Sequence, residues 1–259
     1  MSERSTTTWL LLRGLMRESA HWGDFPEALQ RALPPGAQVI TLDFPGTGVQ
    51  RALRSPGSIA SLTDWCRSEL KRRGVHGPVH VLAMSMGAMV ATEWAYQAPQ
   101  ELAAAVLINT SFAPLSPFYH RLRPRNYLRL LRLVCWYASP LVWEWNILEM
   151  TSQRPAERAG VLPQWVLVRQ QRPVRRADAL RQLLAAARYR VREQAPAVPL
   201  LMLASACDGL VDSRCTQLAA QRWTCALRLH PWAGHDLPLD DPAWVVTQVR
   251  DWVSSRFSS

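Results

Sequence analysis

Ser85, Asp208 and His235 are the residues of this sequence whose types and order could support nucleophilic catalysis. Ser85 stands between two methionines in the stretch VHVLAMSMGAMVATEW, residues 79–94. A serine hydroxyl is a weak nucleophile and needs a base within hydrogen-bond reach, which the imidazole of His235 could provide. That imidazole needs one tautomer held and its positive charge stabilised, which the carboxylate of Asp208 could do. The three side chains therefore form a candidate catalytic triad.

Each member of this candidate triad follows a short apolar run of the kind that forms a buried strand. The three runs are residues 79–83, 199–204 and 227–230. In an open parallel sheet, functional groups gather outside the carboxyl ends of the strands, so the three side chains are expected to meet there. The order serine, aspartate, histidine along the chain is that of hydrolases whose nucleophile sits on a strand-to-helix turn. Asp212, four residues after Asp208, is the competing acid.

The residues on either side of Ser85 fit a sharp turn between a strand and a helix. Such a turn brings the backbone two positions before and after the serine close to neighbouring segments, and the small residues Ala83 and Gly87 stand there. The backbone N–H of Met86 would point toward a developing oxyanion. The N–H of Leu15, in the loop after the first expected strand, would be the second donor of the oxyanion hole. Ser85 is therefore expected to be a nucleophile.

Short apolar runs alternate with helical patterns over residues 1–112, and the alternation resumes after residue 195. Strands that alternate with helices are typical of parallel βαβ units. The sequence therefore predicts an α/β fold with a mostly parallel sheet of about six strands flanked by helices. The expected strands are residues 9–13, 38–43, 79–83, 102–109, 199–204 and 227–230, and the expected helices of this part are residues 22–33, 61–73, 87–97, 213–222 and 242–256.

Residues 113–195 break this alternation and are rich in arginine and tryptophan. The segment holds 15 arginines, no lysine and five acidic residues, so it carries the whole net charge of +10 while the remainder is neutral. We therefore expect one α/β core, residues 1–112 and 196–259, with residues 113–195 inserted as a helical lid. The helices expected in the lid lie near residues 124–137, 140–150, 163–171 and 177–192.

The aromatic and basic residues of the expected lid each allow two interpretations. Trp136, Trp143 and Trp145 could face a membrane, but lid helices must bury an apolar face. We therefore expect these tryptophans to line a hydrophobic substrate pocket together with Met84. The arginines could be a solvated surface. They could also recognise an anionic acyl donor, an acidic acyl-carrier protein or an anionic headgroup, because guanidinium groups pair well with carboxylates and phosphates.

Bulk properties exclude several other classes of protein. A charge excess confined to one segment is not the pattern of a uniformly basic nucleic-acid binder, so no nucleic acid is expected as a partner. The longest uncharged apolar run, residues 133–143, has 11 residues and contains Pro140, so it is too short to span a bilayer. Neither the five cysteines nor any His, Cys, Asp or Glu cluster has metal-ligand spacing, and no cofactor is implied. Reduced cysteines and the lack of a signal-peptide core indicate a cytoplasmic protein.

From about Thr8 to Val253 the chain resembles the α/β-hydrolase superfamily. The pieces that carry the resemblance are RGLMRESAHW, TLDFPGTG, HVLAMSMG, LINTS, LMLASACDGLVD and WAGHDLPLDDP. The last piece is similar to the histidine loop of the small esterase and carboxylesterase branch. The resemblance implies a Ser-His-Asp triad with its acid at Asp208 and a lid after the strand that ends near Ile108. In two departures, alanine replaces the first glycine of the G-x-S-x-G pattern, and Arg13 stands where histidine usually precedes the oxyanion glycine.

These observations predict a serine hydrolase that cleaves a small-molecule carboxylic ester through an acyl-enzyme intermediate. An acyl thioesterase or an acyltransferase would use the same residues and differ in the leaving group or the acceptor. A non-catalytic ligand-binding protein of this fold is a third possibility, although it would not require all three triad residues. A lyase could use the triad as acid and base without an acyl intermediate.

Overall fold

The computed structural model describes residues 7–135 and 139–257 of the 259-residue chain. Six strands form one parallel sheet in the order β2-β1-β3-β4-β5-β6. The predicted α/β fold is confirmed, and each predicted strand is found within one residue of its expected ends. The strands are β1 (Thr8–Leu12), β2 (Gln38–Leu42), β3 (Val79–Met84), β4 (Leu102–Ile108), β5 (Leu200–Ser205) and β6 (Ala226–His230).

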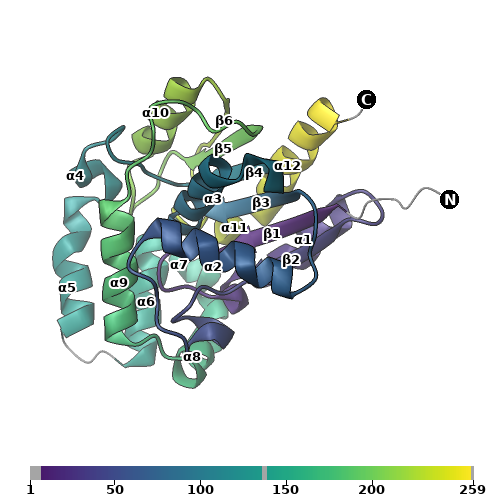
Figure 1. Ribbon diagram of the computed structural model, residues 1–259. Coiled ribbons are helices and arrows are strands. Elements are labelled where there is room, and N and C mark those ends of the chain that lie inside the picture. Colours follow the sequence, from purple (N-terminus) through teal and green to yellow (C-terminus); the bar gives the residue numbers. More distant parts are fainter. Residues whose placement is uncertain (1–6, 136–138, 258–259) are drawn as a thin grey trace.

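Helices cover both faces of the sheet (Figure 1). Successive residues of a strand point to opposite faces, so each strand supplies side chains to two apolar layers. In β3, Val81 and Ala83 enter one layer and Leu82 enters the other. The first layer is closed by α2 (Ile59–Arg72), α3 (Met86–Gln97) and α10 (Arg214–Trp223), and the second by α1 (Phe25–Ala32) and α12 (Pro242–Phe257).

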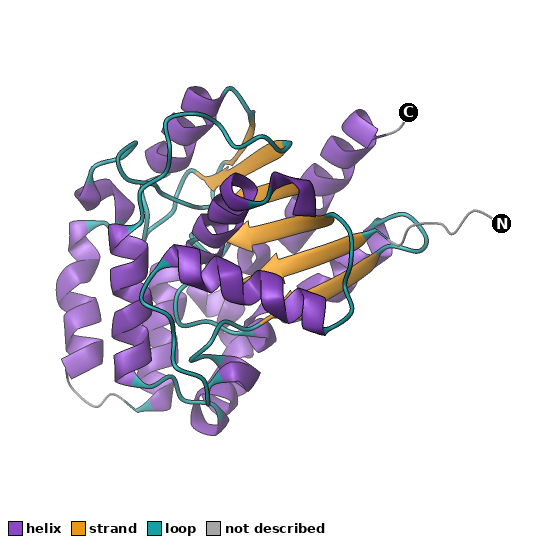
Figure 2. Cartoon of the chain, viewed as in Figure 1, coloured by secondary structure: helices purple, strands orange, loops and turns teal. Residues whose placement is uncertain are grey.

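The carboxyl ends of the strands meet at one edge of the sheet (Figure 2). The register pairs Ile108, the last residue of β4, with Met84 on one side and with Leu203 on the other. The strands are parallel and their last residues are aligned, so the residues that follow β3, β4 and β5 lie together at this edge.

The helices between β4 and β5 lie beyond this edge, and we call α4 to α9 the lid (Figure 1). Within the described part of this segment, the one β contact is an isolated parallel bridge between Ala113 and Arg190. No helix in the described ranges is long and apolar enough to cross a membrane. The lid helices are α4 (Phe118–Arg121), α5 (Tyr127–Cys135), α6 (Pro140–Thr151), α7 (Pro155–Arg158), α8 (Leu162–Gln171) and α9 (Arg176–Arg188).

Three short α-helices were not predicted from the sequence, two in the lid and one after β6. The single-turn helices α4, α7 and α11 (Leu237–Asp240) have four residues each. A helix of one turn is too short to show a 3.6-residue apolar period, so the sequence holds no periodic signal for it. The four lid helices that were predicted correspond to α5, α6, α8 and α9.

The start of α3 packs unusually close to the end of β1. A Cβ atom placed on Gly87 would lie 2.6 Å from the carbonyl oxygens of both Leu12 and Arg13. Backbone atoms cannot yield as a flexible side chain can, so this position requires glycine. The sequence pattern around Ser85 thus reflects a contact between two backbones.

We expect Gly87→Ala to lower the free energy of unfolding by about 1–3 kcal/mol, because the added methyl overpacks a rigid site. The melting temperature of the variant should fall by several degrees. Gly57→Ala is the matched control, since a Cβ there meets nothing within 4 Å. Equal melting temperatures for the two variants would show that the Gly87 contact is not tight.

Candidate active site

The turn at Ser85 has a backbone conformation that is rare for a residue with a side chain. Ser85 has φ +55° and ψ −116°, between the end of β3 and the first residue of α3. Its N–H donates to the carbonyl oxygen of Ile108 (2.9 Å), and its own carbonyl accepts from Thr110 Oγ1 (3.2 Å). These bonds from the end of β4 hold the strained turn in place.

The loop after β1 passes directly over this turn. A Cβ on Gly14 would lie 3.1 Å from Ser85 Cβ and 3.6 Å from Ser85 Oγ. Among the described residues, the amides of Leu15 and Met86 donate no hydrogen bond to a side chain or to the carbonyl of a loop or turn. Met86 is the first residue of α3, so its N–H has no acceptor within the helix. Both amides remain available for an acceptor atom beside Ser85.

Asp208 and His235 are in contact and buried. His235 Nδ1 lies 2.7 Å from Asp208 Oδ2, and the two residues are 3% and 2% exposed. The other carboxylate oxygen, Asp208 Oδ1, accepts hydrogen bonds from the amides of Leu210 (2.8 Å) and Val211 (2.9 Å). A carboxylate at Nδ1 favours the tautomer with the proton on that nitrogen, which leaves the lone pair of Nε2 free to act as a base.

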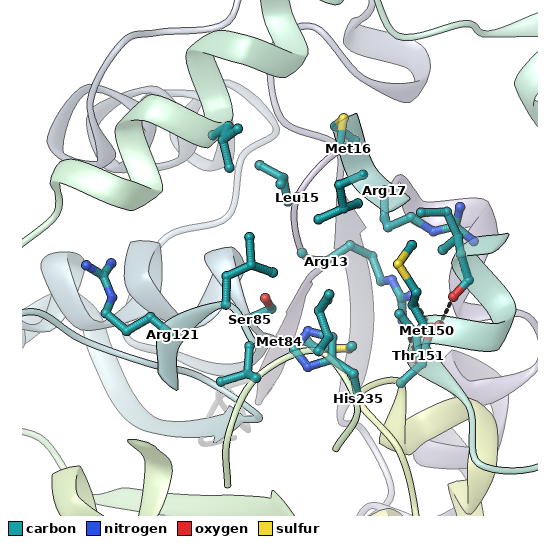
Figure 3. Close-up of a pocket in the computed structure, with 18 of the residues that line it drawn as sticks. Arg13, Leu15, Met16, Arg17, Met84, Ser85, Arg121, Met150, Thr151 and His235 are labelled. Atoms are coloured by element: carbon teal, nitrogen blue, oxygen red, sulfur yellow. Dashed lines mark hydrogen bonds and ion pairs between the residues drawn. The ribbon is translucent and has the colours of Figure 1, made fainter. Parts of the chain in front are cut away.

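Ser85 and His235 line the same cavity, whose volume is about 180 Å³ (Figure 3). Of the residues predicted for the oxyanion hole and pocket, Leu15, Met84 and Trp143 also line it. Trp145 does not line this cavity, because it packs within the lid against a cluster that contains Leu148, Leu162 and Trp165. Trp136 lies outside the described residues.

Asp212, the competing acid, is engaged elsewhere. Its carboxylate binds the Arg214 guanidinium at 2.7 Å and lies 3.6 Å from that of Arg123. Hydrogen bonds from Arg214, with the charge of Arg123, lower the pKa of Asp212 to about 2. Asp212 therefore serves as a partner for arginines in the part of the chain where α10 meets the lid.

A buried ion pair joins the loop after β1 to the loop that carries His235. Arg13 binds Asp236 through two hydrogen bonds, Nη1 to Oδ1 at 3.1 Å and Nη2 to Oδ2 at 2.6 Å. Both side chains are about 4% exposed or less, and the Arg13 guanidinium lies 4.6 Å from the ring centre of Trp22. Burial alone would raise the pKa of Asp236, but the charge and hydrogen bonds of Arg13 outweigh it and hold that pKa below its usual value. The unusual Arg13 thus bridges the candidate oxyanion hole and the histidine loop.

Two further arginines line the cavity. Arg17 donates to Glu144 of α6 at 2.6 Å and stacks on Trp165 with 4.1 Å to its ring centre. Burial lowers the pKa of Arg17, and the charge and hydrogen bond of Glu144 oppose this shift. Arg121 donates to the carbonyl oxygens of residues 186 and 187 at the end of α9, and no carboxylate of the described residues pairs with it. Among the described residues that line the cavity, Arg121 is therefore the arginine whose positive charge no carboxylate offsets.

Asn109 is a supporting residue that sequence analysis did not identify. It follows β4 with φ +46° and is 1% exposed. Its Nδ2 donates to Ser205 Oγ at 2.9 Å, to the Gly234 carbonyl oxygen at 3.2 Å and to the His235 carbonyl oxygen at 2.8 Å, while Oδ1 accepts from the Ser205 amide. One amide thus ties the ends of β4 and β5 to the histidine loop. An asparagine directly after a strand, where a positive φ is tolerated, was the available signal.

Among the described residues, no three His, Cys, Asp or Glu side chains lie close enough together to hold a metal ion. What the residues around Ser85 provide is a hydroxyl, an imidazole oriented by a carboxylate, and backbone donors, which suits acyl transfer.

The sheet order, the turn after β3 and the position of these groups beyond the strand ends define a class of hydrolase folds. A family model described as "Alpha/beta hydrolase family" matches residues 9–248. The chain belongs to this family, as its sequence motifs predicted. No curated protein matches the chain significantly.

Solved structures share the fold over nearly the whole chain at low sequence identity. An enol-lactonase from Burkholderia xenovorans LB400 has a TM-score of 0.79 and 15% identity, with 98% of this chain and 94% of the other covered. A thermophilic esterase from Thermogutta terrifontis has a TM-score of 0.74 and 20% identity, covering 96% and 90%. A hydrolase from Pseudomonas aeruginosa has a TM-score of 0.77 and 20% identity, covering 96% and 91%.

We expect Asn109→Ala to lower the free energy of unfolding by about 1–3 kcal/mol, because it leaves buried polar groups of Ser205 and His235 without partners. Urea denaturation measures the change. Asn146→Ala is the control, since Asn146 lies on the lid, half-buried, and bonds mainly within α6 and to Arg129. A loss for Asn109→Ala no larger than that of the control would contradict the role assigned to Asn109.

Proposed function

We propose that the protein is a serine hydrolase that cleaves carboxylic esters through an acyl-enzyme intermediate. The observation that carries the proposal is the 2.7 Å contact between Asp208 Oδ2 and Nδ1 of His235, a residue that lines the same cavity as Ser85. The strained turn at Ser85 adds to it, because that backbone conformation exposes a side chain at the start of a helix. The esterase and the enol-lactonase named above have the same fold, which is compatible with ester chemistry.

In the proposed reaction, Ser85 Oγ attacks the ester carbonyl carbon while His235 Nε2 takes the hydroxyl proton. The amides of Leu15 and Met86 donate to the oxygen that becomes negative. The tetrahedral intermediate collapses, the bond to the alkoxy oxygen breaks, and His235 returns the proton to the departing alcohol. Water then attacks the acyl-enzyme with His235 as base, and the carboxylic acid leaves Ser85 with its proton restored. Asp208 stays ionised throughout and stabilises the imidazolium.

Ser85→Ala is expected to lower kcat/KM for p-nitrophenyl esters by at least about 10³-fold and to abolish labelling by a fluorophosphonate, because no nucleophile remains. Intact-protein mass measures the labelling. A wild-type protein that is neither labelled nor active would contradict the proposal and favour a non-catalytic ligand-binding protein of the same fold. Turnover without any covalent label would favour the lyase alternative.

The two neighbouring acids provide a matched comparison. Asp208→Asn should lower kcat by roughly 10⁴-fold, because the amide favours the wrong tautomer of His235. Asp212→Asn removes the same charge four residues later and should lower kcat less than about 10-fold, since Asp212 pairs with Arg214 instead. Pre-steady-state and steady-state kinetics of both variants test the assignment, which fails if Asp212→Asn is the more damaging change.

A second candidate is an acyl thioesterase or acyltransferase that acts on an anionic or carrier-bound acyl donor. The observation in its favour is Arg121, which lines the cavity and pairs with no carboxylate of the described residues. For an anionic acyl donor, kcat/KM should fall several-fold between ~0.05 M and ~0.5 M salt, because ions screen the attraction. A neutral ester is the control and should respond little. Equal salt responses of the two substrates would argue against recognition of an anion.

A further inference from the structure

A second cavity adjoins the one that contains Ser85. It has a volume of about 330 Å³, and three side chains, Met16, Trp143 and Leu183, line both cavities. These three side chains come from the loop after β1, from α6 and from α9. The Ser85 cavity alone, at about 180 Å³, is smaller than the ~300 Å³ at which small-molecule sites usually begin. The second cavity offers a ligand larger than a short ester a continuous path past these three side chains.

The second cavity has a mainly apolar wall. Two arginines, Arg169 and Arg176, are the only charged side chains among the described residues that line it. Such a wall suits an aliphatic chain, because burial removes the methylene groups from water. The other lining residues of this cavity are Leu133, Pro173, Val174, Ala179 and Leu180.

Two of the three residues between the cavities, Met16 and Trp143, make defined contacts. The Met16 amide donates to Gln182 Oε1 at 2.9 Å. Gln182 is fully buried and directly precedes Leu183 on α9. The ring of Trp143 lies 3.9 Å beneath the Arg169 guanidinium, which in turn lies 3.6 Å from a Glu144 oxygen. The backbone of Met16 and the ring of Trp143 are therefore fixed at the boundary between the cavities, and Leu183, 43% exposed, forms its outer side.

We propose that the second cavity is a distal subsite for a long, unbranched apolar chain of the ester substrate. The chain runs from Ser85 between Met16, Trp143 and Leu183 and ends near Ala179 and Leu180. This inference rests on the proposed ester hydrolysis and adds the class of substrate, an ester with a long aliphatic chain. Because Met16 follows Leu15 directly, a chain between these side chains also packs against the loop that carries one oxyanion donor.

The subsite is tested with p-nitrophenyl esters of increasing chain length and with variants whose larger side chains block the second cavity. The measured quantity is the ratio of kcat/KM for p-nitrophenyl palmitate to that for p-nitrophenyl acetate, so that general damage to the enzyme cancels. Ala179→Trp fills the second cavity alone, and Leu183→Trp fills its entrance. Each should lower the ratio by at least about 10-fold, since each buried methylene group contributes several-fold to affinity. A parallel series of alkyl acetates distinguishes a chain on the alcohol side from one on the acyl side.

Leu184→Trp is the matched control, because Leu184 lies on α9 next to Leu183 but lines neither cavity. It should leave the ratio and the acetate activity unchanged. The proposal is overturned if neither Ala179→Trp nor Leu183→Trp lowers the ratio in either series. It is also overturned if the wild-type protein rejects chains longer than butyrate.

Binding of a fluorescent sixteen-carbon fatty acid separates failure of the subsite from failure of the proposed function. If the wild-type protein hydrolyses no ester at all, the proposed function fails, but the binding measurement still tests the cavity. Weaker binding in Ala179→Trp than in Leu184→Trp supports the subsite. Equal binding in all three proteins overturns it.

Discussion

The backbone of Ser85 is held in a conformation that residues with side chains rarely adopt, and the rest of the site depends on it. A residue in such a region costs about 1–3 kcal/mol unless its surroundings over-determine it. Here the end of β4 supplies bonds to both the N–H and the carbonyl of Ser85, and glycines at positions 14 and 87 let the chain after β1 approach the turn closely. The strain fixes where the hydroxyl and the amide of Met86 lie relative to the strand ends.

The ion pair between Arg13 and Asp236 links the loop after β1, which passes over this turn, to the loop that contains His235. A buried ion pair gains little net stability, because the desolvation of both charges offsets most of their attraction. Its effect here is geometric: the two-pronged guanidinium fixes the loop after β1 relative to the residue next to His235. Arg13, which stands where the sequence resemblance led us to expect histidine, therefore pairs with an acid 223 residues later.

The fold could be predicted from the sequence because apolar periodicity and turn residues are local signals. The strand ends also predicted which polar side chains would share one edge of the sheet. Helix orientation was harder to predict. Trp143 and Trp145 stand two residues apart on α6, so they point to nearly opposite sides, and only Trp143 faces the Ser85 cavity. The contacts of Asn109 join segments that are 96 to 126 residues apart, and no local pattern encodes such distant pairing.

The lid and the histidine loop are built as one unit. A Cβ on Gly234 would lie 2.5 Å from the carbonyl oxygen of Thr151, the last residue of α6, and that oxygen accepts the amide of Asp236 at 2.8 Å. The Asp240 carboxylate accepts from Ser152 Oγ and from the Gly234 amide. The end of α6 therefore cannot shift without moving the residues on both sides of His235. Because α6 also supplies Trp143 to the cavity wall, the same contacts set the shape of the pocket and the position of the imidazole.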